Sequence, residues 1–150
     1  IYTYAYKEAE LAMYFDTLNP EEQVSYLIKP IIEVLQGAGG QLERSEIRNR
    51  ISELDERIGQ FEKKLYTSSK TGNQYKRFDF RFSFAIKELS YVGYISYVKY
   101  NPQITLTQKG ANVDLATFDV QTEVRDKAHI YWEECAAKNR DKNKRLRHRI

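Results

Sequence analysis

The clearest hydrophobic pattern in the sequence lies between residues 77 and 91. Apolar side chains recur there mainly at steps of three and four residues: Phe78, Phe82, Ala85, Ile86 and Leu89. This spacing predicts a helix over residues 77–91 with one buried face. Gly93 follows and is expected to end the helix. Two runs rich in β-branched and aromatic residues, 94–100 and 103–106, flank Asn101-Pro102 and predict a β-hairpin.

Two further helices are predicted at the start of the chain. Apolar positions over residues 4–18 share one helical face, and Asn19-Pro20-Glu21-Glu22 is a strong start signal. It combines a capping side chain, a proline in the first turn and acids near the positive helix end. A second helix should therefore run over residues 20–36, with Pro30 inside it as a kink or break. Glycine-rich residues 37–40 end that helix, and we expect a short strand at residues 41–42.

The middle of the chain predicts a third helix, which Ser45 can cap and which buries Ile47, Ile51 and Leu54. Residues 55–65 keep helical spacing, so this helix continues or restarts there. Residues 67–73 are rich in Ser, Thr, Lys and Gly and predict a loop before the aromatic helix. After the hairpin we expect a short helix near residues 111–115 and a long helix near residues 120–144.

The order helix, turn, short strand, helix, helix, hairpin is that of a winged helix-turn-helix. We therefore predict a mainly α fold with a small β-hairpin, of the α+β class, flanked by extra helices at both ends. Residues 1–150 are expected to form a single domain with a core over about residues 20–116. The sequence begins with Ile1 rather than methionine, which suggests part of a longer protein.

The net charge of +3 is unevenly distributed along the chain. Residues 1–65 carry a charge of −4 and residues 66–150 carry +7, and residues 138–150 alone hold seven basic groups and one acid. This charge asymmetry is typical of a nucleic-acid-binding protein that contacts its partner through one basic face. For the basic tail, a solvated C-terminal helix is an equally weighted alternative.

Composition narrows the class of protein further. The single cysteine, Cys135, excludes an internal disulfide and gives no argument for secretion. No apolar run is long enough to span a membrane, and no signal-peptide pattern is present. We therefore expect a cytoplasmic protein without a membrane partner.

Residues 24–115 resemble the N-terminal domain of Mrr-type restriction endonucleases. The stretch Arg77-Phe78-Asp79-Phe80-Arg81-Phe82-Ser83-Phe84-Ala85 is similar to the family pattern Arg-Phe-Asp-Asn-Arg-x-x-Trp-Ala, with Phe80 in place of asparagine and Phe84 in place of tryptophan. Leu106-Thr107-Gln108-Lys109-Gly110 is similar to the closing Leu-Thr-x-Lys-Gly. The resemblance implies a winged helix that recognises duplex DNA, in a family that cuts modified DNA with a separate nuclease domain.

The nuclease chemistry of that family needs an Asp and a Glu-x-Lys that hold a divalent metal. Asp55 and Glu62-Lys63-Lys64 supply these residue types. However, the residues around them have helical spacing, which would not bring the two carboxylates together on a metal. His129 and Cys135 are six residues apart on a predicted helix, so they cannot build a zinc site. We expect no catalytic site, no metal and no cofactor in this chain.

DNA contacts are expected from the aromatic helix and the elements beside it. Basic side chains can bind phosphates, and a guanidinium can also bind guanine in the major groove. The candidate DNA-binding residues are Asn73, Gln74, Lys76, Arg77, Arg81, Lys99 and Asn101. Alternatively, Arg81 pairs with Asp79 or Glu88 as an ordinary surface charge.

A second apolar stripe on the same helix contains Phe80, Phe84 and Tyr91. Such a stripe more often packs on another helix than stacks on bases, and the terminal helices are the obvious cover. Trp132 is expected to pack on the body from the C-terminal helix.

Three functions remain open at this point. The first is the target-recognition part of a restriction-type endonuclease. The second is a stand-alone transcriptional regulator that forms a homodimer through its terminal helices. The third is a winged helix used only for protein contacts.

Overall fold

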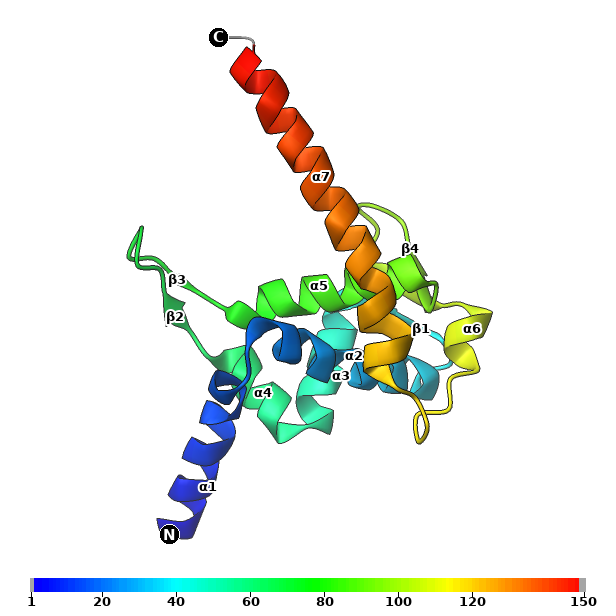
Figure 1. Ribbon diagram of the computed structural model, residues 1–150. Coiled ribbons are helices and arrows are strands. Elements are labelled where there is room, and N and C mark those ends of the chain that lie inside the picture. The colour runs from blue at the N-terminus through cyan, green and yellow to red at the C-terminus, as the bar shows by residue number, and fades with distance from the viewer. Residues whose placement is uncertain (1, 149–150) are drawn as a thin grey trace.

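Helices form most of the molecule. The computed structural model describes the backbone of residues 2–148 and the side chains of residue 7 and residues 9–147. The helical elements are α1 (Tyr2–Met13), the 3-10 turn η1 (Tyr14–Thr17), α2 (Pro20–Gly37), α3 (Arg44–Leu54), α4 (Glu56–Lys63), α5 (Arg77–Val92), α6 (Gln108–Ala111), the π-helical segment η2 (Gln121–Arg125) and α7 (Asp126–His148). In Figure 1, α1 and the far end of α7 leave the central body in opposite directions.

The strands are short and antiparallel. They are β1 (Gln41–Glu43), β2 (Tyr66–Thr67), β3 (Gln74–Tyr75), β4 (Ile95–Tyr97) and β5 (Gln103–Leu106). One sheet has the order β1-β5-β4, with Leu42 opposite Ile104 and Ser96 opposite Thr105. A mainly helical chain with a small antiparallel sheet confirms the predicted fold class.

The sheet and three helices have a winged-helix-like arrangement. β1 follows α2 and leads into α3, and α5 leads directly into the β4–β5 hairpin, the wing. α5 packs on α2 and α4 with one face and on η2 and α7 with another. The buried side chains of α2 recur at helical spacing and form the centre of the core: Val24, Leu27, Ile28, Ile31, Ile32 and Leu35.

Two sequence signals act differently from their predictions. Pro30 was expected to kink or break α2, and the helix continues through it to Gly37, so no break occurs there. Burial of its apolar residues on both sides of the proline holds the helix together, because packing outweighs one missing hydrogen-bond donor. Ser45 does not cap α3, because that helix already begins at Arg44 after Glu43 and has no side-chain cap. Asp55 ends α3 and caps α4 instead, since its Oδ1 accepts a hydrogen bond from the Arg57 backbone N–H at 2.8 Å.

Three elements differ from the sequence-based assignment. The short helix expected near residues 111–115 lies earlier, as α6, because the Thr107 hydroxyl caps it by accepting a hydrogen bond from the Gly110 N–H at 3.2 Å. The strands β2 and β3 flank the predicted loop and turn it into a hairpin. The C-terminal helix begins with a π-helical segment and continues past Lys144 to His148.

The base of the wing is closed by two glycines and a threonine. Gly93 ends α5 with a φ of 95°, a left-handed conformation that favours glycine. The Thr107 hydroxyl donates to the Gly93 carbonyl at 2.5 Å. A Cβ on Gly110 would come within 2.1 Å of the Tyr94 carbonyl oxygen, so only glycine fits there. The Leu106–Gly110 motif therefore stabilises the junction of α5 with the wing.

Candidate nucleic-acid interface

α5 has a buried face and an open strip. Its buried side chains are Phe78, Phe82, Ala85, Ile86, Glu88 and Leu89. On the opposite side, Lys87 is exposed and Phe80 is 53% exposed, with its ring 6.1 Å from that of Tyr75 on β3. The two other aromatic residues of the predicted stripe are partly covered: Phe84 lies against Trp132 at 5.1 Å and Tyr91 against Tyr131 at 5.0 Å between ring centroids. The open strip is therefore centred on Lys87 and Phe80.

Two arginines of α3 lie beside this strip. Arg44 donates a hydrogen bond to the Ser83 hydroxyl at 2.8 Å, and its guanidinium lies 5.3 Å from the Phe82 ring centroid. Arg48 pairs with Asp79 at 2.7 Å. These residues line a shallow groove of about 440 Å³ between α3, α5 and Pro102 in the turn of the wing. The groove places two guanidinium groups at one edge of α5.

The basic residues predicted at the start of α5 are tied to neighbouring elements. Lys76 pairs with Glu62 of α4 at 3.1 Å. The guanidinium of Arg77 lies 3.9 Å from the Tyr66 ring centroid, on the β2–β3 hairpin. Arg81 faces α2, and burial lowers the pKa of its guanidinium, although arginine stays charged. It bonds Gln23 rather than Asp79 or Glu88, the two partners considered from the sequence.

The predicted polar residues before α5 lie at the β2–β3 hairpin. Asn73 and Gln74 are exposed, and the Asn73 carbonyl accepts a hydrogen bond from the Ser68 N–H at 2.9 Å. Figure 1 shows this hairpin reaching out from the body beside the first turn of α5. Both side chains are therefore accessible next to the start of that helix.

The predicted wing residues lie in the turn between β4 and β5. Lys99 and Asn101 are both exposed. The Asn101 Oδ1 accepts a hydrogen bond from the Gln103 backbone N–H at 2.9 Å, so this side chain also shapes the turn. The structure thus places the seven predicted residues at three locations: the β2–β3 hairpin with the start of α5, the flank of α5 that faces α2, and the turn of the wing.

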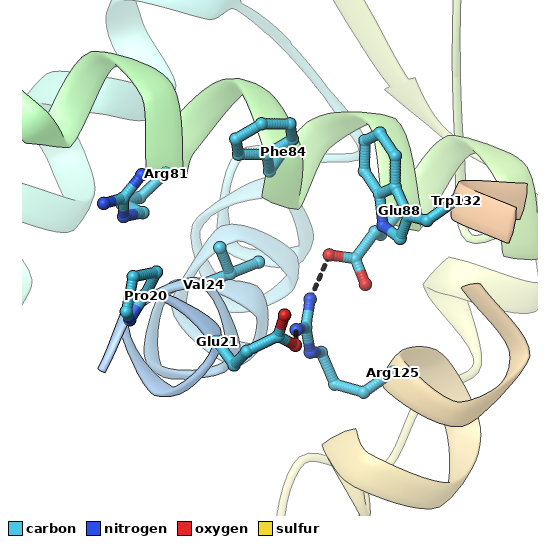
Figure 2. Close-up of a pocket in the computed structure, with 8 residues that line it drawn as sticks. All are labelled: Pro20, Glu21, Val24, Arg81, Phe84, Glu88, Arg125 and Trp132. Carbon is cyan, nitrogen blue, oxygen red and sulfur yellow. Dashed lines mark hydrogen bonds and ion pairs between the residues drawn. The ribbon is translucent and has the colours of Figure 1, made fainter. Parts of the chain in front are cut away.

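A separate pocket lies on the flank of α5 that faces α2 and η2 (Figure 2). Glu88 is buried there and pairs with Arg125, which also pairs with Glu21 of α2. Burial raises the pKa of Glu88 to about 7, against the opposing attraction of the Arg125 guanidinium. These contacts anchor η2, and with it the start of α7, to α2 and α5.

The residues considered for metal chemistry have other partners. Asp55 accepts a hydrogen bond from the Tyr26 hydroxyl at 2.6 Å, and Glu62 pairs with Arg48 and Lys76. Among the described residues, no three His, Cys, Asp or Glu side chains are grouped so that they could hold a metal ion. Within the same part of the chain, every helix is too short or too polar to cross a lipid bilayer.

The basic tail extends the last helix into solvent. Residues 138–147 of α7 are all exposed, and Figure 1 shows this part of the helix leading away from the body. Arg149 and Ile150 lie outside the described residues. The first turns of α7 behave differently, since Ala128 is buried and Trp132 packs on Phe84 as predicted.

Comparison with known protein families identifies the central part of the chain. Residues 25–116 match the model of the Mrr N-terminal domain, and this range runs from the first turns of α2 past the wing and α6. The chain belongs to the Mrr N-terminal domain family. α1, η1, η2 and α7 lie outside the matched region. No match was found among curated proteins or among solved structures.

Membership in the Mrr N-terminal domain family confirms the resemblance read from the aromatic helix and the closing motif. The structure adds three candidate contacts that were not predicted from the sequence: Arg44, Arg48 and Lys87. Lys87 had a usable signal, because it lies opposite the apolar spacing of α5. The two arginines had a weaker signal, since only the packing of α3 against α5 brings them to the strip.

Proposed function

We propose that this chain binds duplex DNA as the recognition part of an Mrr-type restriction endonuclease, with the cutting chemistry supplied by a separate nuclease domain. The observation that carries the proposal is the open strip of α5 between the α3 arginines and the wing. In helix-turn-helix proteins, the second helix of the motif enters the major groove and reads base edges. Family membership supports the same assignment for α5.

The proposed contacts follow from position and charge. Lys87 lies at the centre of the strip and would reach into the groove or to a phosphate. Arg44 and Arg48 would bind phosphates along one edge, and Lys99 and Asn101 would contact the backbone or the minor groove. Lys87, Lys99 and Asn101 are exposed, and the partly exposed Arg44 and Arg48 line one groove with Pro102, which supports this set.

The residues at the start of α5 take a second role in the proposal. Asn73 and Gln74 would contact bases or phosphates from the hairpin, and Lys76 and Arg77 would bind nearby phosphates. Arg81 would act mainly by positioning α5, because its guanidinium bonds Gln23.

A stand-alone regulator is the second candidate. The feature that favours it is α7, which extends well beyond the body and could meet a second copy (Figure 1). A homodimer through α1 and α7 would then place two α5 helices on one DNA molecule. Sedimentation of the free protein tests this candidate, because the regulator requires a dimer and a monomer would exclude it.

DNA binding itself is tested by measuring affinity for a fluorescently labelled duplex at several salt concentrations. Phosphate contacts release counterions, so the logarithm of affinity should fall linearly with the logarithm of salt, with a slope near −0.9 per contact. Binding that is weak and independent of salt would contradict the proposal and favour a winged helix used for protein contacts.

A further inference from the structure

The turn at the tip of the wing holds a tyrosine in a backbone conformation that favours glycine. The Asn101 N–H donates a hydrogen bond to the Val98 carbonyl at 2.9 Å, which closes a four-residue turn. Tyr100 is the third residue of this turn and has a φ of 70°. Turns with a positive φ at the third position usually carry Gly or Asn there. A bulky residue in this conformation is strained, so some other interaction must account for it.

Packing within the molecule does not account for it. Tyr100 is 93% exposed and Val98 is 69% exposed, which makes them the two most exposed large apolar residues among those that the structure describes. The Lys99 ammonium lies 5.1 Å from the Tyr100 ring centroid. The tip of the wing therefore presents an aromatic ring, a branched aliphatic side chain and a cation in three consecutive residues.

The base of the turn is well held, although its tip is open. The Asn101 side chain accepts a hydrogen bond from Gln103, and the Pro102 carbonyl accepts one from the Arg44 N–H at 2.8 Å. The second bond joins the wing to the first residue of α3. The apolar tip is therefore presented at a set position relative to the arginines beside α5.

We infer that Tyr100 and Val98 form a wedge that enters the minor groove of the duplex and unstacks a base step, while Lys99 binds an adjacent phosphate. This inference rests on the proposed function, since it requires DNA on the open strip of α5. Apolar side chains that enter the minor groove unstack bases and bend the duplex toward the major groove. The Lys99 cation beside the ring and the two arginines that line the groove with Pro102 make DNA a better partner than an apolar protein groove. The wing would then bend the DNA as well as hold it.

The test compares Tyr100→Gly and Tyr100→Phe with the parent chain. The glycine variant removes the ring and also removes the backbone strain, so its thermal stability should equal or exceed that of the parent. Its affinity for a duplex of about three helical turns should fall roughly tenfold, as expected when a base loses a stacking partner. The phenylalanine variant keeps the ring and should bind like the parent.

Bending is measured in the same samples by energy transfer between dyes at the two ends of the duplex. Transfer should rise when the parent or Tyr100→Phe binds, and it should not rise with Tyr100→Gly. If the glycine variant binds and bends DNA like the parent, or if the parent binds without bending it, the wedge is wrong while the proposed function stands. Self-association of the parent that disappears in Tyr100→Gly would also overturn the wedge. If the parent binds no DNA, both proposals fail.

Discussion

Arg81 Nε donates a hydrogen bond to Gln23 Oε1 at 2.8 Å. The Gln23 side-chain amide in turn donates to the Phe15 carbonyl at 2.8 Å, and Gln23 is only 2% exposed. This chain of bonds joins α5 to the start of α2 and to η1. Arg81 therefore holds α5 in place from a partly buried position on its flank.

Replacing Arg81 with alanine should lower the free energy of unfolding by about 1–2 kcal/mol, because it leaves a buried amide oxygen without its donor. Urea unfolding provides the measurement. The control is Arg50→Ala, which removes an exposed ion pair with Glu46 at 3.8 Å and should cost less than about 0.5 kcal/mol. Equal losses for the two variants would show that the bond to Gln23 adds nothing to stability.

Trp132→Ala should weaken the packing of α7 on α5. The Trp132 ring meets Phe84 edge to face at 5.1 Å, and its side chain is partly exposed. We expect a loss of about 1–3 kcal/mol in unfolding free energy, below the cost of removing a fully buried aromatic. Glu133→Ala is the neighbouring control, since that side chain is 66% exposed. A melting temperature that Trp132→Ala leaves unchanged would contradict this packing role.

The buried carboxyl of Glu88 should make stability depend on pH. Its folded-state pKa of about 7 lies above the ordinary value of 4.5, so the folded protein holds this proton more tightly than the unfolded chain. The stability that the protonated Glu88 carboxyl contributes is fully present below its pKa in the unfolded chain. This contribution is lost as pH rises through the folded-state pKa of about 7. Between the unfolded and folded pKa values of Glu88, the unfolding free energy of the parent should fall by about 1–3 kcal/mol relative to that of Glu88→Gln.

The pH measurement is a series of urea unfolding curves for the parent and Glu88→Gln between about pH 5 and pH 8. Asp16 and Glu62 have lowered pKa values and act in the opposite direction at acidic pH, but they are common to both proteins. The difference between the two proteins therefore isolates Glu88. A difference that stays constant across the series would show that this carboxyl titrates normally.

The sequence predicted most of the helices and the wing, because their apolar spacing and their glycine and proline signals are local. It also predicted that Trp132 packs on the body, since that residue lies on an apolar helical stripe. It could not predict the bond between Arg81 and Gln23 or the ion pairs of Arg125, since these partners are far apart in the chain. The apolar spacing of α5 is enough to predict that Lys87 is exposed. Arg44 and Arg48 became candidates only because the structure places α3 beside α5.

Asp79→Asn should strengthen DNA binding. Asp79 is an exposed acid at the edge of the open strip, and it pairs with Arg48 at 2.7 Å. Removing its charge lessens repulsion of phosphates and leaves Glu62 as the one remaining acidic partner of Arg48 among the described residues, so affinity should rise several-fold and the salt slope should steepen by about one contact. Binding curves at two salt concentrations provide the measurement. A variant that binds more weakly than the parent would show that Asp79 contacts the DNA itself or positions Arg48 for it.

The most direct test of the interface is the salt dependence of duplex binding by Lys87→Ala. Lys87 is exposed at the centre of the open strip, whereas Lys7, the control, is exposed on α1. We predict that Lys87→Ala lowers affinity by about 1–3 kcal/mol and reduces the magnitude of the salt slope by about one, while Lys7→Ala leaves both unchanged. If Lys87→Ala binds with the affinity and salt slope of the parent, α5 does not contact DNA through this strip.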